Sequence, residues 1–489
     1  MRERVTFVHS PDAHVEPSAL QLQPAGLVGP ATTAIRQDRL TFALNELPLE
    51  LGSFLRTAGA VHVRWTTAEE HDSLEPFSSR LSPGLWLSFT PLTDGGPNSV
   101  RTLCGLLQAF GPLDCMTPEA FTRAETAASF SLHQRLDDLS ALVRWGVHEL
   151  CADTDPICHA RTRALYTAAS LDISFDSADQ LLKVAAFWPL RKQVLTVAAS
   201  DTRRTEVGVF TKDAPPNMGP LEVGLGGLLS VMREHKEPSP TLFSFPSRHR
   251  ASGASFSSEF LAPTGLHPTL QLRLSTNTIT ADSDAECAPY AYLTLPRTVF
   301  ADRYQLGDKL LLASKNLSAL RHSTLPVDLE APEYATKTWG SSILLELAPP
   351  TPRSGQAWTA EVPLHARYVK PTASGYSELQ IPYPAVFWAC SSEGTADFSN
   401  NPFDRRHVGY DALFGPETTF WHATPRAEVG GRLVSSLTIP TLREDGAAWV
   451  RLGTTVVVGL GFAWVMGRIV AAAWGKGQDK SEAVGKRRR

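Results

Sequence analysis

The sequence predicts a mainly β protein: two sheet-based domains, with some helix in the N-terminal half, followed by one C-terminal transmembrane helix. Three observations lead to this prediction. The 489 residues exceed one ordinary domain, short segments of alternating apolar and polar residues recur along the chain, and one long uncharged segment stands near the C-terminus. With 43% hydrophobic and 20% charged residues, the chain falls outside the disordered and the wholly membrane-embedded classes.

Segments that alternate with a period of two suit strands with one buried face. They are residues 60–65, 85–90, 171–175, 270–274 and 362–369. The 36 Pro and 34 Gly residues are spread between these segments and mark turns. We therefore expect sheets joined by turns to form most of the body.

One stretch of the N-terminal half predicts a helix, because Thr117 suits the N-cap and Pro118 the first turn. Its apolar face would consist of Leu132, Leu136, Leu139 and Val143. Residues 238–258 are rich in Ser and Pro without sustained periodicity, which predicts a linker or a long loop. We place the domain boundary there, with an N-terminal β-rich or mixed domain at 1–250 and a second β-rich domain at 260–448.

Residues 452–474 predict the membrane span. The first sixteen carry no charge, Arg468 interrupts the run, and the apolar segment continues to Trp474. As a helix, 23 residues extend roughly 34 Å, enough to cross a hydrocarbon core of roughly 30 Å. Arg468 can extend its side chain to the headgroups, and Trp449 and Trp474 stand at the two expected interfaces. The alternatives are a buried core helix or a single Val-rich strand.

Small residues recur every four positions in this span and form a stripe along one helix face. They are Thr455, Gly459, Ala463, Gly467 and Ala471. Such a stripe lets a second helix approach closely within the bilayer, so we expect it to pack against another membrane protein. The alternative is that small residues are simply common in transmembrane helices.

The charge distribution predicts the orientation of the span. Residues 475–489 form a basic tail with a charge of +4, whereas residues 1–474 sum to −8 within the overall −4. An acidic body argues against nucleic-acid binding, which needs clustered Lys and Arg on the folded part. Basic residues beside a single span stay on the cytoplasmic side, so the body would lie in the lumen or outside the cell. No signal peptide is recognisable, which keeps a tail-anchored protein with a cytosolic body as an alternative.

Asn316, in Asn-Leu-Ser, is the one permitted N-glycosylation acceptor, and a lumenal body predicts that it is modified. The last four residues, 486–489, are all basic and suit either a flank that enforces topology or a retrieval signal. Six cysteines permit disulfides in an oxidising lumen, at a density too low for a disulfide scaffold. Proximity suggests Cys104 with Cys115 and Cys151 with Cys158, and the sequence does not choose between pairings.

No segment predicts a catalytic or metal site above chance. The DxD triplets at 153–155 and 282–284 have the spacing with which glycosyltransferases hold a metal and a sugar nucleotide, but such triplets are common in an acidic chain. Residues 224–227 lack the last glycine of a dinucleotide-binding loop. We therefore expect no catalytic residues, cofactor or metal, and keep a membrane-anchored lumenal enzyme with a DxD site as a rival.

Residues 287–422 carry several strings in a fixed order. They are YLTLPRTVFADRYQL at 292–306, VPLHARYV at 362–369, PAVFWAC at 384–390, NPFD at 401–404 and GYDALFGPETTFWH at 409–422. With the span that follows, these strings resemble the PIG-X family, the small lumenal subunit of the first mannosyltransferase of glycosylphosphatidylinositol (GPI) assembly. The resemblance covers residues 270–474. The first 250 residues resemble, more weakly, the N-terminal extension of the long fungal-type members.

The resemblance implies a non-catalytic role. PIG-X-like proteins stabilise a multi-spanning catalytic subunit, PIG-M, which transfers the first mannose from dolichol-phosphate-mannose to the GPI precursor on the lumenal side. The chain would then be a single-pass glycoprotein of the endoplasmic reticulum membrane with a cytoplasmic C-terminus. A general folding factor of the endoplasmic reticulum is the second rival. Four aromatic residues of the matching segment suit either partner contact or core packing: Phe387, Trp388, Phe420 and Trp421.

Overall fold

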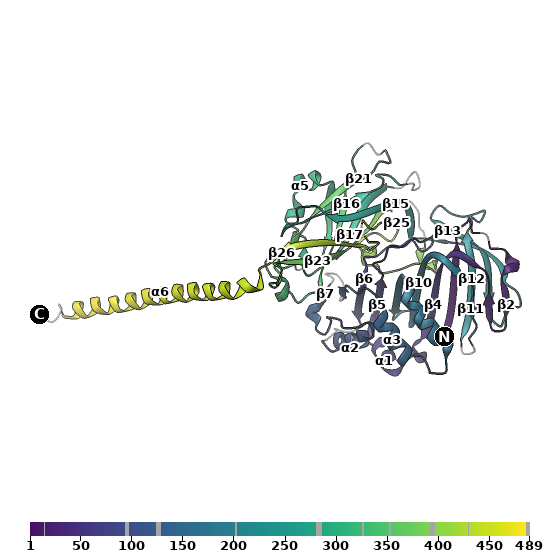
Figure 1. Cartoon of the computed structure of the whole chain (residues 1–489), viewed down its shortest axis with the longest axis horizontal. Coiled ribbons are helices and arrows are strands. Elements are labelled where there is room, and N and C mark those ends of the chain that lie inside the picture. The colour runs from purple at the N-terminus through teal and green to yellow at the C-terminus, as the bar shows by residue number, and fades with distance from the viewer. Residues whose placement is uncertain are drawn as a thin grey trace.

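The computed structural model of the chain describes residues 1–13, 15–92, 97–123, 129–200, 203–279, 286–324, 327–351, 354–391, 397–428 and 430–485, with the backbone alone at 97 and 475–485. Two large sheets form the body, and one long helix, α6 (Glu444–Gly485), extends from one end of it (Figure 1). Strands dominate, and the other helices are short. The predicted fold class is confirmed.

The N-terminal half folds into an 11-stranded sheet. In spatial order its strands are β14 (Ser239–Pro246), β13 (Glu222–Val231), β12 (Arg204–Lys212), β1 (Arg2–His9), β4 (Ala31–Ala43), β10 (Leu181–Val194), β9 (Ser170–Asp176), β5 (Ala58–Thr66), β6 (Gly84–Pro91), β8 (Phe130–Gln134) and β7 (Thr122–Arg123). The neighbours are antiparallel except β1 and β12, which run parallel. A three-stranded sheet of β11 (Val197–Ala198), β3 (Gly26–Val28) and β2 (Gln21–Gln23) packs against β1.

Helices cover one face of this sheet, below the strands in Figure 1. They are α1 (Leu49–Leu55), α2 (Pro97–Leu107), α3 (Ser140–Glu149) and α4 (Pro156–Ala164). Because side chains alternate along a strand, Val61, Val63 and Trp65 of β5 face the helix-covered core. The intervening His62 and Arg64 point to the opposite face, and both are buried there. Both faces of β5 are therefore covered.

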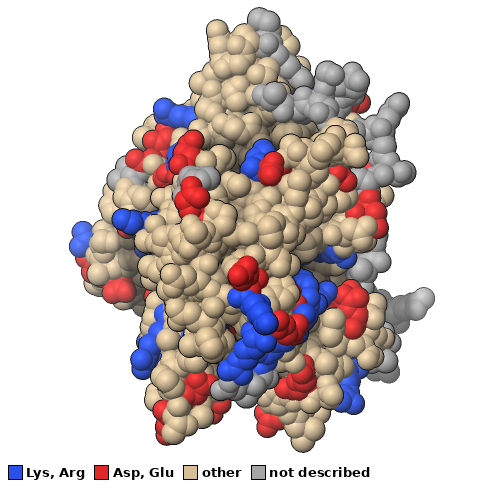
Figure 2. Space-filling view, turned by 90° about the vertical axis from the view of Figure 1, so that its right-hand side faces the viewer, with Lys and Arg blue, Asp and Glu red and all other residues tan. Residues whose placement is uncertain are grey.

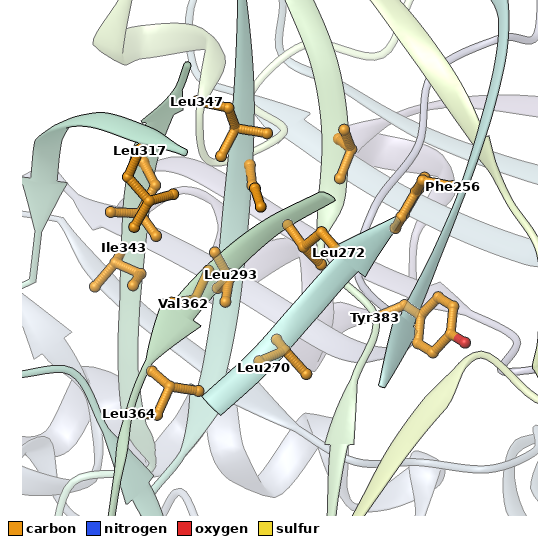
Figure 3. Close-up of a cluster of buried hydrophobic side chains, with 14 of the residues drawn as sticks. Phe256, Leu270, Leu272, Leu293, Leu317, Ile343, Leu347, Val362, Leu364 and Tyr383 are labelled. Carbon is orange, nitrogen blue, oxygen red and sulfur yellow. The ribbon is translucent and has the colours of Figure 1, made fainter. Parts of the chain in front are cut away.

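The C-terminal half folds into an eight-stranded sheet. In spatial order its strands are β19 (Leu317–Ser323), β20 (Gly340–Leu347), β17 (Glu286–Pro296), β24 (Ala385–Ser391), β25 (Thr418–Pro425), β15 (His249–Phe260), β16 (Thr269–Leu274) and β21 (Trp358–Pro363). Two short pairs join it, β18 (Val299–Phe300) with β22 (His365–Ala366) and β23 (Tyr376–Pro382) with β26 (Val434–Pro440), as does helix α5 (Lys309–Ser314). Leu272, Leu293 and Val362 converge from separate strands in its apolar core (Figure 3).

The predicted strands are largely confirmed. Four of the alternating segments lie inside β5, β6, β9 and β16. The fifth, residues 362–369, is only partly a strand, because β21 ends at Pro363 and β22 covers His365–Ala366 alone. Proline has no N–H to donate to a sheet. Beyond it the chain leaves the ladder, and Arg367 N donates instead to Thr298 O at 2.8 Å.

A three-residue 3-10 helix, Pro118–Ala120, follows Thr117 as predicted, but its continuation as a long helix is wrong. Leu132 lies in β8, Leu136 and Leu139 lie in the connection that follows, and Val143 lies in α3. All four nevertheless contact the same apolar core. Their spacing therefore reflected shared burial and not a continuous helix, because a strand, a loop and a helix can each direct an apolar side chain into one core.

The linker or long loop predicted at residues 238–258 is also wrong, because β14 and β15 occupy most of this segment. β14 is an edge strand, where Pro240 and Pro246 are tolerated since one side of the strand needs no partner. The chain passes from the first sheet to the second between Pro246 and His249. The domain limits themselves stay predictions, as residues 397–411 contact both halves.

Disulfides account for all six cysteines. They are Cys104–Cys115, Cys151–Cys158 and Cys287–Cys390. The first two are the pairings that proximity suggested. The third joins residues 103 positions apart in the sequence, which are direct partners across β17 and β24. Only the strand pairing could reveal it.

Lys and Arg gather in a band on the end of the body opposite α6, with acidic side chains among them (Figure 2). Strands β1 and β12 lie at this end (Figure 1) and bring three arginines around Glu206. Arg2, Arg4 and Arg204 each approach its carboxylate within 2.6 to 2.7 Å. A carboxylate therefore offsets part of the positive charge at this end.

Candidate functional site

Helix α6 is long and apolar enough to cross a membrane between Glu444 and Trp474, with a mean hydropathy of 1.9 in its apolar part. None of that part is buried against the body, and the helix projects away from it (Figure 1). A core helix would be covered on at least one side. The alternative of a buried core helix or a strand is therefore contradicted.

The stripe of small residues lies on this exposed helix, at Thr455, Gly459, Ala463, Gly467 and Ala471. A Cβ added at Gly459 or Gly467 would meet no atom within 4 Å, so the space beside both glycines is open. Thr455 Oγ1 donates to Arg451 O at 2.9 Å and thereby satisfies its hydroxyl within the helix. The packing role of this face stays a prediction.

The body holds the start of α6 through hydrogen bonds. Only residues 441–443 separate β26 from the helix. Thr372 N donates to Leu442 O at 3.0 Å, and Glu444 N donates to Thr372 O at 3.1 Å. The hydroxyls of Thr372 and Thr441 lie 2.7 Å apart. A connection this short and this well bonded fixes the direction of the helix relative to the second sheet.

The second notable region is the junction loop, residues 397–411, which comes from the C-terminal half and packs on the first sheet. Its Phe403 is 8% exposed and contacts the cluster that contains Val8 and Ile35. The ring of Phe403 lies 5.3 Å from that of Phe77 and 5.4 Å from that of Phe245. Aromatic contacts of this kind add to the burial of apolar area. The loop is thus anchored by a buried aromatic side chain.

Buried charges accompany this anchor. Arg64 Nε of β5 lies 3.2 Å from Asp172 Oδ1 of β9, and Arg405 Nε of the junction loop lies 3.0 Å from Asp172 Oδ2. Arg64 Nη1 also donates to the carbonyl of His407 at 2.7 Å. The side chain of Arg64 is only 4% exposed. One carboxylate therefore balances two guanidinium groups where water is largely excluded.

Histidines and a carboxyl group occupy the other side of the loop. His249 Nδ1 of β15 and His422 Nε2 of β25 lie 2.9 Å apart, and His249 Nε2 lies 3.7 Å from Asp404 Oδ1. Burial lowers the pKa of His249 to about 4 and that of His422 well below its usual range. Burial also raises the pKa of Asp404 to about 7. Both imidazole rings are therefore neutral at neutral pH.

A cavity of about 320 Å³ opens beside the junction loop. Its lining includes Arg248, His249, Asp404, Arg406 and Asp411. These groups bond within the C-terminal half: Arg248 donates to the carbonyls of Thr418 and Gly415, and Asp411 Oδ2 accepts from His407 N. Among the residues that the structure describes, no group of three or more His, Cys, Asp or Glu suits a metal ion. These bonds therefore fix the shape of the C-terminal half beside the junction loop.

The structure places the predicted glycosylation site at the end of α5. Asn316 is half-buried with φ 56°, and its Nδ2 donates to Thr359 O at 2.7 Å. Asp155 of the first DxD triplet caps α4 by accepting from the backbone N–H groups of Ile157 and Cys158. The second triplet, 282–284, lies outside the described residues, as do residues 486–489. Modification of Asn316 stays a prediction.

The four aromatic residues of the matching segment pack mainly inside the protein. Phe387, Trp388 and Phe420 are buried in the cores of the second sheet. Trp421 is half-buried, with the guanidinium of Arg250 5.0 Å above its ring. Core packing therefore accounts for three of the four.

Reasoning from the sequence missed the junction residues. The period-two pattern of 60–65 put His62 and Arg64 on the polar face of a strand, which usually faces water. Here a loop more than 300 positions later covers that face, as the bond from Arg64 to His407 shows. The available signal is the dense mixture of aromatic and charged residues at 401–411, part of which belongs to the strings that resemble the PIG-X family.

Known proteins resemble this chain over nearly its whole length. The family described as PIG-X / PBN1 matches residues 263–470. Protein PBN1 of Gibberella zeae is 54% identical over 477 residues, which cover 96% of both chains. Protein pbn1 of Neurospora crassa is 46% identical over 476 residues, 96% of this chain and 95% of that one.

The chain belongs to the PIG-X/PBN1 family. Membership supports a role in GPI-anchor biosynthesis. Protein pbn1 of Aspergillus oryzae, 36% identical over 98% of this chain, also aligns with the N-terminal sheet, so that sheet is shared with relatives although the family match begins at residue 263. A solved structure of the Fcho1 Mu homology domain of Danio rerio with a bound Eps15 peptide covers 90% of this chain and 95% of its own. Its sequence identity is 9% and its TM-score is 0.15, so we draw no conclusion from this match.

Proposed function

We propose that this chain is a non-catalytic, stabilising subunit of GPI mannosyltransferase I in the endoplasmic reticulum membrane. It would support a PIG-M-type catalytic subunit, which transfers the first mannose from dolichol-phosphate-mannose to the GPI precursor. Family membership supports the pathway. The observation that carries the subunit role is α6, an apolar helix with an open small-residue face and no partner within the described part of its own chain.

Helix packing in a bilayer explains why such a face calls for a partner. Lipid tails are as apolar as leucine, so helices associate through close contact of their surfaces and not through the hydrophobic effect. The open space beside Gly459 and Gly467 permits that contact. Because residues 441–443 tie α6 firmly to β26, a helix contact would also hold the body against the lumenal side of the partner.

Substitution of the two glycines tests the contact. Gly459→Ile with Gly467→Ile fills the open face without a clash inside the chain. We expect this variant to lose co-purification of the PIG-M-type subunit from membranes and to lower mannosylated GPI precursors. Gly461→Ile is the matched control, because it lies two residues, or about 200° around the axis, from Gly459 and is equally open. An undiminished complex in the double variant would overturn the helix contact.

Topology requires a separate experiment, a glycosylation and protease-protection assay with Asn316→Gln as the reference. A lumenal body predicts protection of residues 1–443 in intact microsomes and a shift in mobility that Asn316→Gln abolishes. Protection decides the topology by itself, because Asn316 is half-buried with its amide bonded to Thr359 O. A body accessible to protease would support the cytosolic, tail-anchored alternative.

Two rival functions give different results. Replacing Asp153, Asp155, Asp282 and Asp284 by Asn should leave complementation intact, whereas a lumenal DxD enzyme would lose it. Cross-linking from the body should yield one stoichiometric partner. A broad set of unfolded clients would instead identify a general folding factor.

A further inference from the structure

Histidines concentrate in the contact between the two halves of the body. His62 of β5 stacks on His407 of the junction loop, with ring centroids 4.4 Å apart. His249 and His422 stack at 5.2 Å and share a hydrogen bond. A fifth histidine, His71, contacts an arginine: its Nε2 lies 3.1 Å from Arg80 Nη1. The first pair joins the two halves directly.

Each of these contacts disfavours an added positive charge. Two imidazolium rings in either stacked pair would repel each other at short range, and His71 already adjoins a guanidinium. Buried polar atoms without a partner in the described structure include both ring nitrogens of His62, His249 Nε2 and His422 Nδ1. No carboxylate lies within 4 Å of His62 or His422 to accept a new charge, among the ion pairs of the described residues. The neutral rings fit, and charged rings do not.

Charged groups of both signs surround the histidines. They are Arg64, Asp172 and Asp176 from the first sheet, Asp72 and Arg80 from the segment before β6, Arg248 before β15, and Asp404, Arg405, Arg406 and Asp411 from the junction loop. Burial, followed by these arginines, lowers the pKa of His62 to about 2 and that of His71 to about 4. Asp404 opposes the trend, because it already holds a proton near neutral pH.

We propose that the junction is an acid-sensitive latch: protonation of its paired histidines frees the junction loop from the N-terminal sheet while both sheets remain folded. The opened loop exposes imidazoles that accept protons at the ordinary histidine value, so acid favours the open form. Among the described residues, the apolar cores of the two sheets contain no such pairs, and the pair His267 and His365 lies outside the junction with the ring of His267 exposed. His133, buried in β8, bonds to Pro83 O at 3.0 Å and has Trp339, not a second histidine, beside it.

Proton uptake sets the size of the effect. Each histidine freed on opening increases the opening equilibrium constant by up to about tenfold for each pH unit below its ordinary pKa. Because opening releases two stacked pairs, the opening equilibrium constant would depend steeply on pH. Release of the Asp404 proton subtracts about one proton from this uptake. We expect a net uptake of at least two protons.

Hydrogen exchange on the full-length protein in detergent tests the proposal. Protection factors of residues 397–411 and of β17 are compared between about pH 7.5 and about pH 5.5. We expect protection of the loop to fall at least about a hundredfold while β17 stays protected. A loop that remains protected, or a loop and β17 that lose protection together, would overturn the latch.

A variant of His62 provides a second test of the proposal. His62→Phe keeps an aromatic ring and loses no hydrogen bond, because neither nitrogen of His62 has a partner in the described structure. We expect it to move the opening midpoint to lower pH and to reduce the proton uptake by about one. His148→Phe, exposed on α3, is the matched control and should leave both unchanged. An unshifted midpoint in His62→Phe contradicts the proposal, and should that variant fail to fold, the wild-type exchange profile decides alone.

Discussion

Arg405 Nε of the junction loop lies 3.0 Å from Asp172 Oδ2 of β9, and this ion pair joins the two halves of the body. Arg64 approaches the other oxygen of the same carboxylate. One acidic side chain therefore pairs with two arginines where the loop meets the first sheet. Several properties of the protein should respond when that side chain, or a neighbour of it, is changed.

Asp172→Asn should destabilise the body by about 3–5 kcal/mol, because it leaves two guanidinium groups without their counter-ion in a largely dry site. The free energy of unfolding in denaturant measures the effect. Asp179→Asn removes the exposed pair with Lys183 and is the control, for which a loss below about 1 kcal/mol is expected. Equal losses of unfolding free energy in the two variants would show that burial of the Arg64–Asp172 pair adds nothing to its contribution to stability.

Phe403→Ala should loosen the junction loop, since it removes a buried ring from between Phe77 and Phe245. A loss of about 3–5 kcal/mol is expected for a buried phenylalanine. Limited trypsin digestion at neutral pH should then cut after Arg405 or Arg406 faster than in the wild type. Leu413→Ala, at a partly exposed position just beyond the loop, should leave the digestion rate nearly unchanged. If Phe403→Ala is cut no faster, the ring does not hold the loop.

Asp404→Asn should show a pH-dependent gain over the wild type. Folded Asp404 keeps its proton up to about pH 7, whereas an ordinary aspartate has a value of 3.8. Folding therefore binds a proton in this window, and the contribution of Asp404 to stability, complete below pH 3.8, is lost as the pH rises to about 7. Asparagine has no such dependence.

The difference in unfolding free energy between Asp404→Asn and the wild type should therefore grow from about pH 5 to about pH 7, by up to about 1.4 kcal/mol per unit, and then level off. The histidines other than His249, which lies 3.7 Å from Asp404, are common to both proteins and cancel. A difference that is constant with pH would contradict the raised pKa of Asp404.

Removal of the disulfides should have unequal effects. Cys287–Cys390 closes a loop of 103 residues, and Cys151–Cys158 closes one of 7. In the chain-entropy account, the longer loop restricts the unfolded chain more, by about 2 kcal/mol. The double Ser variant at Cys287 and Cys390 should therefore lose more stability than the one at Cys151 and Cys158. Equal losses would argue that native contacts, and not loop length, set the contribution of each bridge.

The sequence was sufficient for features that depend on local patterns. The alternation in residues 60–65 predicted β5, and the uncharged run at 452–467 predicted the apolar part of α6. It failed where a local pattern has two explanations. Leu132 and Val143 share a core without sharing a helix, and Pro240 lies on an edge strand although a run with prolines suggested a loop. The spacing of apolar residues therefore indicates which side chains are buried more directly than it indicates the backbone conformation.

The junction lay beyond such reasoning for a different reason. Arg64 and His62 occupy the polar positions of an alternating strand, and nothing near them in the sequence says that residues 397–411 cover them. Contacts between residues so far apart become visible only when both sheets are built. The disulfide between Cys287 and Cys390 was hidden in the same way.

The placement of β1 has a consequence for synthesis of the protein. Although β1 precedes every other described strand along the chain, it lies inside its sheet between β4 and β12, so its parallel edge stays open until residues 204–212 have been made. The face of β5 then waits for the junction loop, which is followed within about 35 residues by the start of α6. Nascent chains would thus expose an unfinished edge through much of translation. They would complete the body only as the membrane helix emerges, which makes that stage the most vulnerable to aggregation.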